Sequence, residues 1–275
     1  MASTIWKYQN YNAPIQYLFD KQIVEMDISK ANISILMSAG KISRETYNEL
    51  YDAPRHTRQY IVGCMIRDNP SLQGALNEGL ENARHALFDT LGLENSNILH
   101  IAKDAVFIIV PMNQRVPDAI PIDHFIAFTK RASFTNYLRL NKLIHFYHSY
   151  NIAIGLYEYK IRGMSENAQK LHHHFFTQVL IEILTGRQMN GFKVAYEITK
   201  QWYEKLSSID NITLVDYLRR FDSQSLFDLK GFSEFAPFQA DYLSESARLY
   251  VDPSYNLSLL NDIGNYLLCE AISGI

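Results

Sequence analysis

The feature that most constrains the fold is a pair of apolar, β-branched runs, each interrupted by a single aspartate. The runs cover residues 24–36 and 100–110, and the aspartates are Asp27 and Asp104. An unpaired charge inside an apolar sheet costs several kcal/mol, so buried strands seldom carry a lone carboxylate. If the two runs are neighbouring strands of one sheet, their carboxylates lie close together and must share a proton or bind a cation.

Two carboxylates that hold Mg²⁺ are the arrangement used for in-line phosphoryl transfer. We therefore expect Asp27 and Asp104 to bind Mg²⁺ (or Mn²⁺) on a sheet and to handle a nucleotide. Glu25 alternates with Asp27 along the strand and shares its face, which makes it a candidate third ligand. The alternative is structural: each aspartate would end a strand, cap a helix or pair with a lysine such as Lys30 or Lys103.

The residues between the two aspartate segments are expected to be helical. Apolar side chains change from alternating to helical spacing just after Asp27, which predicts a short helix within 28–38. Three more helices are expected at 43–52, 55–67 and 71–91. Ser43 is the expected N-cap of the first, and Gly92 ends the last. The chain then returns to a strand over 98–111.

Beyond the second aspartate the pattern is mixed at first and then helical. Residues 123–131 and 152–161 are typical of strands, whereas 137–150 is ambiguous between strand and helix. Helical spacing dominates from Ser165 onward. The expected fold class is α+β, with an α/β region at 1–164 that contains a helical insertion at 41–97, and a mostly helical region at 165–275.

Composition restricts the partners and the compartment. The net charge of −3 gives no general positive field, so nucleic acid would have to bind a local patch. The two cysteines, Cys64 and Cys269, show no metal-ligand spacing and fit a reducing cytoplasm. The first residues lack an apolar signal core, and no run is apolar enough for a membrane span. We expect a soluble cytoplasmic protein, from a cell or from a virus that replicates in one.

Two short motifs resemble those of family B DNA polymerases. Asp27-Ile-Ser-Lys-Ala-Asn-Ile-Ser-Ile resembles the first palm motif, Asp-x-x-Ser-Leu-Tyr-Pro-Ser-Ile. Lys-Asp104-Ala-Val-Phe resembles the end of the third motif, Tyr-Gly-Asp-Thr-Asp-Ser-Val-Phe, with Ala102 in place of its first aspartate. The resemblance implies that Asp27 and Asp104 are the catalytic metal ligands. It also implies that the backbone of Ile28 and Ser29 contacts the phosphates of the nucleotide.

The helix between these motifs resembles the fingers motif of the same family. Arg84-His-Ala-Leu-Phe-Asp-Thr-Leu-Gly92 is similar to Lys-x-x-x-Asn-Ser-x-Tyr-Gly. Arg84 stands where the family has the lysine that meets the incoming triphosphate, and Gly92 is retained. Three positions depart from the family pattern, which puts sugar and base selection in doubt: Phe88, Asp89 and Leu91.

Four further cations are candidates for binding phosphates. Arg55 and Arg58 are three residues apart on one face of a predicted helix and would complete a triphosphate clamp. Lys160-Ile-Arg162-Gly163 is similar to the Lys-x-Lys-Gly strand end that faces the primer or template backbone in the family. The alternative for all of these cations is a solvated surface with local salt bridges.

The resemblance covers residues 18–186 and implies a palm-like antiparallel sheet with a helical fingers insertion, followed by helices that form a reduced thumb. The implied activity is metal-dependent nucleotidyl transfer, polymerase- or primase-like. Its partners would be a nucleoside triphosphate and primer–template nucleic acid, with a protein partner as a further candidate and no membrane. Reverse transcriptases share the first motif, but their third motif needs adjacent aspartates, which Lys103-Asp104-Ala105 lacks.

A second function class stays open. A palm without its chemistry would serve as a binding or assembly protein that targets a nucleic acid or a partner protein. Ala102, Phe88 and Asp89 favour this alternative, whereas the presence of both Asp27 and Asp104 opposes it. Binding of Mn²⁺ between the two aspartates would separate the two classes.

Overall fold

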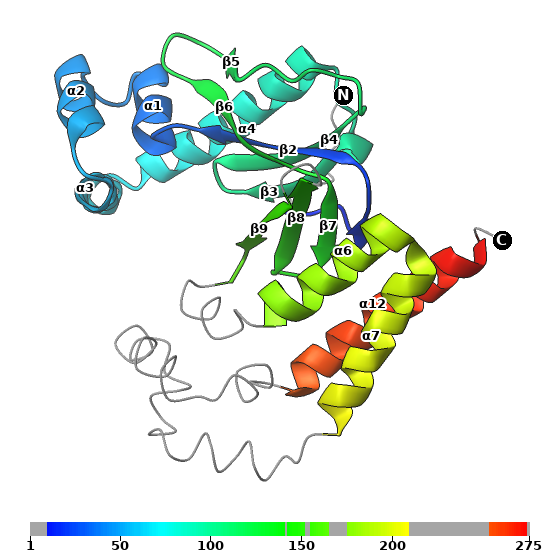
Figure 1. Ribbon diagram of the computed structural model, residues 1–275. Helices are drawn as coiled ribbons and strands as arrows, with labels where there is room; N and C mark the ends of the chain where they lie inside the picture. The colour runs from blue at the N-terminus through cyan, green and yellow to red at the C-terminus, as the bar shows by residue number, and fades with distance from the viewer. Residues whose placement is uncertain (1–9, 141, 152–154, 165–174, 209–252, 274–275) are drawn as a thin grey trace, which may run out of the picture. The chain divides into compact units, whose positions relative to one another are not determined.

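Figure 1 shows the computed structural model of the chain. It describes residues 10–140, 142–151, 155–164, 175–208 and 253–273. Helices and antiparallel sheets occur together, so the predicted α+β class is confirmed. The chain divides into two compact units, residues 1–137 and 138–275, and each is described by itself. The functional division expected after residue 164 stays a prediction.

The first unit is built on a five-stranded antiparallel sheet (Figure 1). The strand order is β3-β4-β2-β6-β5, so β2 lies in the middle of the sheet. β2 pairs with β4 on one side and with β6 on the other, in both cases antiparallel. The strands are β2 Gln22–Ile28, β3 Ile98–Ala102, β4 Ala105–Val110, β5 Ala119–Pro121 and β6 Ala127–Phe134, and a short β1, Tyr17–Leu18, precedes them.

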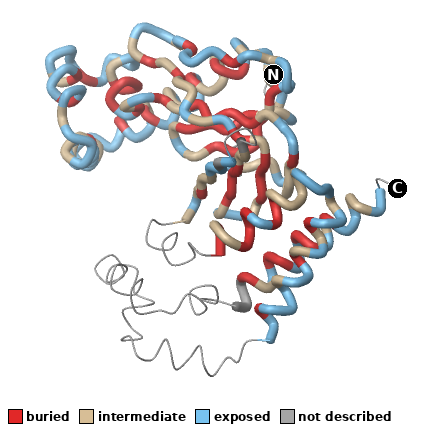
Figure 2. Tube along the Cα trace, in the orientation of Figure 1, coloured by how far each residue is buried: buried red, intermediate tan, exposed pale blue. Residues whose placement is uncertain are grey.

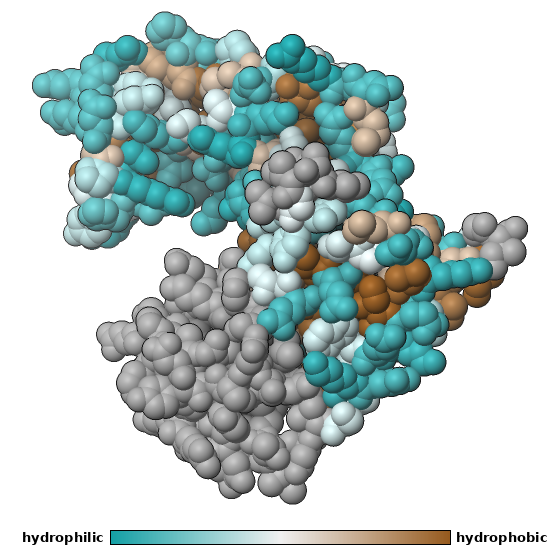
Figure 3. Space-filling view, viewed as in Figure 1, coloured by the Kyte–Doolittle hydropathy of each residue, from teal (hydrophilic) through white to brown (hydrophobic). Residues whose placement is uncertain are grey.

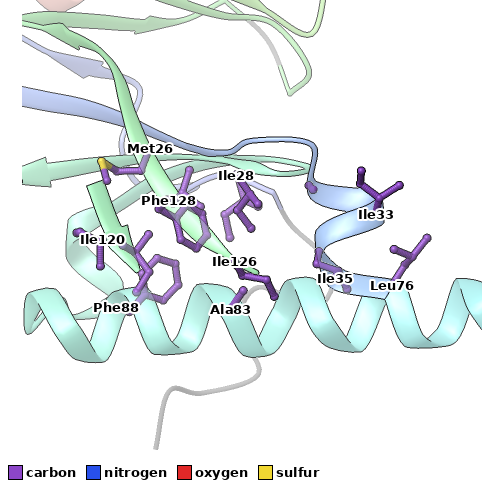
Figure 4. Close-up of a cluster of buried hydrophobic side chains, with 14 of the residues drawn as sticks. Met26, Ile28, Ile33, Ile35, Leu76, Ala83, Phe88, Ile120, Ile126 and Phe128 are labelled. Atoms are coloured by element: carbon purple, nitrogen blue, oxygen red, sulfur yellow. The ribbon is translucent and has the colours of Figure 1, made fainter. Parts of the chain in front are cut away.

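One face of this sheet forms the core of the first unit. Along β2, Val24, Met26 and Ile28 are almost completely buried and belong to one cluster of apolar side chains. Alternation along a strand puts these three side chains on the same face. Figure 4 shows Met26 and Ile28 together with Phe128 of β6 on the side of the sheet where helix α4 (Ser71–Leu91) runs. The strands of this core appear as buried segments in Figure 2.

The first two helices follow β2 directly. α1 (Ala31–Ser38) begins three residues later than the earliest start expected for it, because Lys30 takes a left-handed conformation with a φ of 54°. α2 (Arg44–Asp52) begins after Ser43, whose hydroxyl accepts a hydrogen bond of 3.1 Å from the backbone N–H of Thr46. The predicted N-cap is therefore confirmed.

The next two helices also match their predicted ends. α3 (Arg55–Asp68) begins after Pro54, and α4 ends at Gly92, which has a φ of 63°. Glycine adopts this left-handed conformation without the steric cost that a side chain brings. Figure 3 shows mainly hydrophilic side chains over α2 and α3, as expected for helices at the edge of a unit.

The segment predicted as one strand over 98–111 is a hairpin of two strands, so that prediction was wrong. Ala102 at the end of β3 lies opposite Ala105 at the start of β4. Lys103 and Asp104 form the two-residue turn, and Lys103 takes a φ of 58° as tight hairpin turns require. Glycine or asparagine usually marks such a turn, and a lysine–aspartate pair inside an apolar run gives no such signal. Asp104 therefore lies at the tip of a hairpin.

The strand predicted at 123–131 begins later in the structure, at the start of β6. Asp123 instead lies near the start of the turn between β5 and β6, where its carboxylate accepts hydrogen bonds of 2.7 Å from the backbone N–H groups of Phe125 and Ile126. Aspartate often stabilises turns in this way. β5, which precedes this turn and pairs with β6, was not predicted.

The second unit begins with strands. β7 (Asn136–Arg139) contains the division between the units, and β8 (His145–Asn151) pairs antiparallel with β9 (Leu156–Arg162). The ambiguous segment 137–150 therefore contains strand residues of β7 and β8. Of the strand predicted at 152–161, residues 156–161 belong to β9, and residues 152–154 lie outside the described residues.

Helices complete the second unit. A π-helical turn, Phe175–Leu180, continues into α6 (Ile181–Asn190), and α7 (Phe192–Ser207) packs against α6 and α12 (Pro253–Ser273). The predicted helical character is confirmed for these segments. Three parts of the predicted helical region, residues 165–174, 209–252 and 274–275, lie outside the described residues.

Candidate functional site

The two aspartate segments lie side by side in the first unit, as predicted. In the antiparallel pairing of β2 with β4, Asp27 is opposite Ala105, the residue that follows Asp104. The backbone N–H of Ile28 donates a hydrogen bond of 3.3 Å to the carbonyl oxygen of Asp104. From the spacing of antiparallel strands, the Cα atoms of Asp27 and Asp104 are roughly 6 Å apart. Both residues therefore lie at the same end of the sheet. Asp104 is opposite Ile28, so alternation assigns its side chain to the face of Ile28 and the side chain of Asp27 to the other face.

The carboxylate of Asp27 is paired with a cation that sequence reasoning missed. Nε of Arg131, on β6, lies 3.4 Å from Oδ2 of Asp27, and the two side chains are 45% and 25% exposed. The hydroxyl of Thr129 donates to the backbone carbonyl of Asp27 at 3.2 Å. Lys30, which was considered as a partner for Asp27, instead places its ammonium group 3.2 Å from the centre of the Tyr51 ring.

A β-bulge brings Arg131 to this position. Glu25 of β2 pairs with Ala132, but the next residue, Met26, pairs with Lys130. Arg131 is therefore the extra residue of β6 at this point. Bulges re-aim side chains and are common beside active sites. The cationic pair Lys130-Arg131 at the end of a predicted strand was the one available signal, and it does not reveal a bulge.

Arg84 is held against the hairpin that carries Asp104. Its Nη2 donates a hydrogen bond of 2.7 Å to the carbonyl oxygen of Lys103. Burial lowers the pKa of Arg84, while the negative charges of Glu81 and Asp104 oppose that shift. A guanidinium group stays protonated in proteins, so Arg84 contributes a positive charge near Asp104. Its Nε is buried and has no hydrogen-bond partner among the described residues.

The two backbone groups expected to contact phosphate differ in their surroundings. The N–H of Ile28 is already bonded to the hairpin, as described above. Ser29 is exposed, and its carbonyl accepts a hydrogen bond of 3.4 Å from the hydroxyl of Ser34. The first turn of α1 carries no acidic side chain. Helix N-termini attract anions, so the backbone from Ser29 into α1 is the more suitable phosphate contact.

Arg55 and Arg58 lie on α3, whereas Arg84 lies on α4. Nη1 of Arg58 donates a hydrogen bond of 3.1 Å to the carbonyl of Ala53, the C-cap residue of α2, so Arg58 stabilises the end of that helix. Arg55 is exposed. Of the two, Arg55 is the side chain that can reach a ligand without breaking a described bond.

Glu25 is separated from the tip of the hairpin. It is completely buried and lies opposite Phe107, three positions along β4 from Asp104, or roughly 10 Å at the rise of a strand. Within the part of the chain that the structure describes, no three histidine, cysteine, aspartate or glutamate side chains are grouped to hold a metal ion. Glu25 is therefore too far from the hairpin tip to join Asp104 around one metal ion.

Lys160 and Arg162 lie on β9 of the second unit. They alternate along the strand and so share a face, opposite Tyr147 and His145 of β8. Both are half-buried. Gly163, which follows them, has a φ of 83°, and a Cβ atom there would lie 1.7 Å from the carbonyl oxygen of Leu143. The strand end after Arg162 therefore requires glycine.

β8 also carries two buried histidines that the sequence analysis did not single out. Burial lowers the pKa of His148 to about 4. Burial and the charge of Arg139 lower the pKa of His145 to about 4 as well. Both imidazoles are therefore neutral at physiological pH and belong to the packing of the second unit.

No helix in the described ranges is both long and apolar enough to cross a membrane.

A comparison with curated proteins finds no match to the chain. The family model of the bacteriophage PBS1 gene 130 protein matches residues 1–201, a range that includes Asp27, Arg84 and Asp104. This match covers most of the 275 residues and supports the predicted viral character. The chain therefore belongs to the family of the bacteriophage PBS1 gene 130 protein.

Proposed function

We propose that the first unit carries out divalent-metal-dependent nucleotidyl transfer, polymerase- or primase-like, in the cytoplasm of the infected cell. The observation that supports the proposal is the pairing of β2 with β4, which brings the backbone of Asp27 and the backbone of Asp104 to the same end of the sheet from segments far apart in the chain. Arg84 adds a positive charge at the same end of the sheet. Carboxylates and a fixed cation together suit a substrate that brings both a metal ion and phosphates.

The order of the elements supports the same proposal. The strand with Asp27 is followed by α1, then by α2, α3 and α4, and then by the hairpin with Asp104. The family B polymerase motifs that the sequence resembles have this order: first motif, basic fingers helix, third motif. In this proposal the five-stranded sheet is a palm, and α2 to α4 are a small fingers insertion. The helices after residue 165 would be a reduced thumb.

The donor set fits magnesium. Mg²⁺ prefers carboxylate oxygens and often takes only one or two from the protein, with water and substrate phosphates completing its shell. Asp27 and Asp104 are both partly exposed, so a substrate can reach them. We assign these two as the ligands and leave Glu25 out. When bound there, Mg²⁺ would activate a 3′-hydroxyl group and neutralise the triphosphate.

The cations and the backbone of the first unit would bind the triphosphate. Arg84 would neutralise charge on the leaving pyrophosphate, because it is fixed on the hairpin and keeps its proton. The backbone at Ser29 and the first turn of α1 would donate to phosphate oxygens. Arg55 would reach the outer phosphates from α3, whereas Arg58 would act by fixing the end of α2.

In the second unit, Lys160 and Arg162 are proposed to bind nucleic-acid phosphates. They share one face of β9, and such neighbouring cations favour a phosphate backbone over bases. Replacing both with glutamine should weaken binding of single-stranded and duplex oligonucleotides alike, with little change in sequence preference.

The decisive experiment is the substitution Asp104→Asn in a primer-extension assay with Mg²⁺ or Mn²⁺ and either dNTPs or NTPs. Loss of one ligand should lower incorporation by at least about 100-fold, because the amide oxygen carries no charge for the metal. Asp118→Asn is the matched control, since Asp118 is an exposed carboxylate in the same unit. Full activity of the Asp104→Asn protein, with a normal circular dichroism spectrum, would remove Asp104 from the mechanism.

One observation favours the second candidate, a catalytically inactive binding or assembly protein. The carboxylate of Asp27 already has a protein cation, Arg131, as its partner. A site that had lost its metal would keep its charge balance in this way. This candidate predicts no Mn²⁺ binding and no incorporation, while binding to an oligonucleotide or a protein partner persists in metal-free buffer.

A further inference from the structure

We propose that Arg131 is a displaceable counter-ion of the metal site. It neutralises Asp27 while no metal is bound, and it turns to the phosphates of the substrate once a divalent cation takes its place. This inference rests on the proposed function and assigns a role to a residue that the motifs do not contain.

The geometry of the ion pair suits displacement. Nε of Arg131 lies 3.4 Å from Oδ2 of Asp27, which is longer than a strong charged hydrogen bond. Both side chains are partly exposed, and ion pairs of this kind contribute little to stability. A divalent cation competes easily with such a partner.

The backbone around Arg131 allows the side chain to move. Lys130 and Ala132 pair with Met26 and Glu25, so the ladder between β2 and β6 is maintained on both sides of the bulge. Arg131 is the extra residue and has no opposite residue in that ladder. Its side chain is 45% exposed, so it can change rotamer without leaving a packed position in the core.

The charges of the site explain why a counter-ion is needed there. Asp27 and Asp104 originate at the same end of the sheet, and two neighbouring carboxylates repel each other. Arg131 offsets the charge of Asp27, and Arg84 that of Asp104. A divalent cation bound to Asp27 would supply the positive charge that Arg131 now provides. Arg131 would then be free to bind the phosphates that arrive with the metal, which guanidinium groups favour.

A purely structural role makes a different prediction. If the ion pair only holds β6 to β2, its removal should lower stability and leave metal affinity unchanged or weaker. The two roles therefore differ in the sign of one measurable quantity, the affinity for Mn²⁺.

The experiment compares the full-length wild-type chain with Arg131→Gln and Lys130→Gln. The second variant loses the same charge one residue away and serves as the matched control. Titration with Mn²⁺, followed by electron paramagnetic resonance, should show about threefold tighter binding to Arg131→Gln than to wild type. At saturating Mn²⁺, a non-hydrolysable nucleoside triphosphate should bind Arg131→Gln about tenfold more weakly. Lys130→Gln should match wild type in both titrations.

The outcomes separate this inference from the proposed function. If wild type binds Mn²⁺ and incorporates nucleotides but Arg131→Gln binds Mn²⁺ no more tightly, the counter-ion role is wrong and the proposed function stands. If Lys130→Gln gains as much Mn²⁺ affinity as Arg131→Gln, the gain comes from the change in net charge, and the counter-ion role is also wrong. If neither wild type nor Arg131→Gln binds Mn²⁺, both proposals fail. If the gain in Mn²⁺ affinity disappears in the double variant Asp27→Asn/Arg131→Gln, the counter-ion role is supported.

Discussion

Successive residues of β2 point into two very different environments. Val24, Met26 and Ile28 face the apolar cluster beneath α4 and are almost completely buried. Glu25 and Asp27 alternate with them on the other face, where Asp27 meets the guanidinium group of Arg131. Close packing governs the first face, because any change of volume is felt there. The second face depends on charge balance, because each carboxylate needs a partner.

This difference predicts that the two faces fail in different ways. Substitutions on the apolar face should lower the free energy of unfolding. Substitutions of the charged residues at the end of the sheet should change ligand binding while the fold remains. The following predictions test that separation, from the largest expected change in stability to the smallest.

Phe128→Ala should give the largest loss of folding stability. Phe128 lies on β6 within the apolar cluster and is completely buried, so truncation leaves a cavity. Such substitutions cost about 3–5 kcal/mol. Urea denaturation followed by circular dichroism measures the loss. Tyr60→Ala on α3 is the control, because Tyr60 is 73% exposed and its loss should change stability by less than about 0.5 kcal/mol. Similar losses of stability in Phe128→Ala and Tyr60→Ala would contradict the assignment of Phe128 to the core.

β8 of the second unit extends the comparison to polar groups that are buried without charge. His145 and His148 have pKa values of about 4 in the folded chain, below the value of about 6.5 expected when it is unfolded. Their neutral forms are therefore favoured by folding. The stabilisation is complete above pH 6.5 and declines as the pH falls toward 4. At pH 5, each histidine should lower the free energy of unfolding by roughly 2 kcal/mol relative to its value at neutral pH.

The measurement for the histidines is the free energy of unfolding between pH 7.5 and pH 5. His148→Phe should reduce the pH dependence by about half, since one titrating group remains. If the free energy of unfolding depends on pH equally in this variant and in wild type, His148 does not contribute to the pH dependence.

Gly79→Ala tests the contact between α4 and α1. A Cβ atom at Gly79 would lie 2.3 Å from Cγ2 of the buried Ile35, so the two helices must shift. Overpacking of this kind costs about 1–3 kcal/mol, partly offset by the helix propensity of alanine. Gly74→Ala in the same helix meets nothing within 4 Å and should stabilise by about 0.5 kcal/mol. Thermal denaturation should therefore move in opposite directions for the two variants.

Asp27→Asn should change stability least. The ion pair with Arg131 is partly exposed, and such pairs contribute less than about 1 kcal/mol. The same variant should lose Mg²⁺-dependent nucleotide incorporation, as Asp104→Asn should. A loss of stability as large as that of Phe128→Ala would show that the charged face is structural.

The helices could be predicted well because their ends are coded locally. Ser43, Pro54 and Gly92 act through their own backbone and side-chain chemistry, and the structure has helix ends at these residues. The adjacency of the two aspartate segments was also predictable, because a lone carboxylate in an apolar run calls for a partner. The roles assigned to these residues stay predictions.

Two features could not be read from the sequence, and both depend on pairing between strands. The turn at Lys103 and Asp104 lacks the usual turn residues, so the hairpin looked like one strand. The bulge at Arg131 exists only relative to β2 and leaves no pattern in β6 itself. Arg131 was therefore missed, and the distance of Glu25 from Asp104 was underestimated.

The position of Asp104 at the tip of a hairpin has a consequence for related chains. A slip of one residue between β4 and β2 would turn Val106, Ile108 and Val110 away from the core, so the register is fixed by packing. Lengthening the hairpin by two residue pairs would carry its carboxylate about 7 Å along β2, beyond the reach of the cation that we propose it shares with Asp27. Relatives are therefore expected to vary in the helices between the two aspartates but to conserve the number of residues in β4.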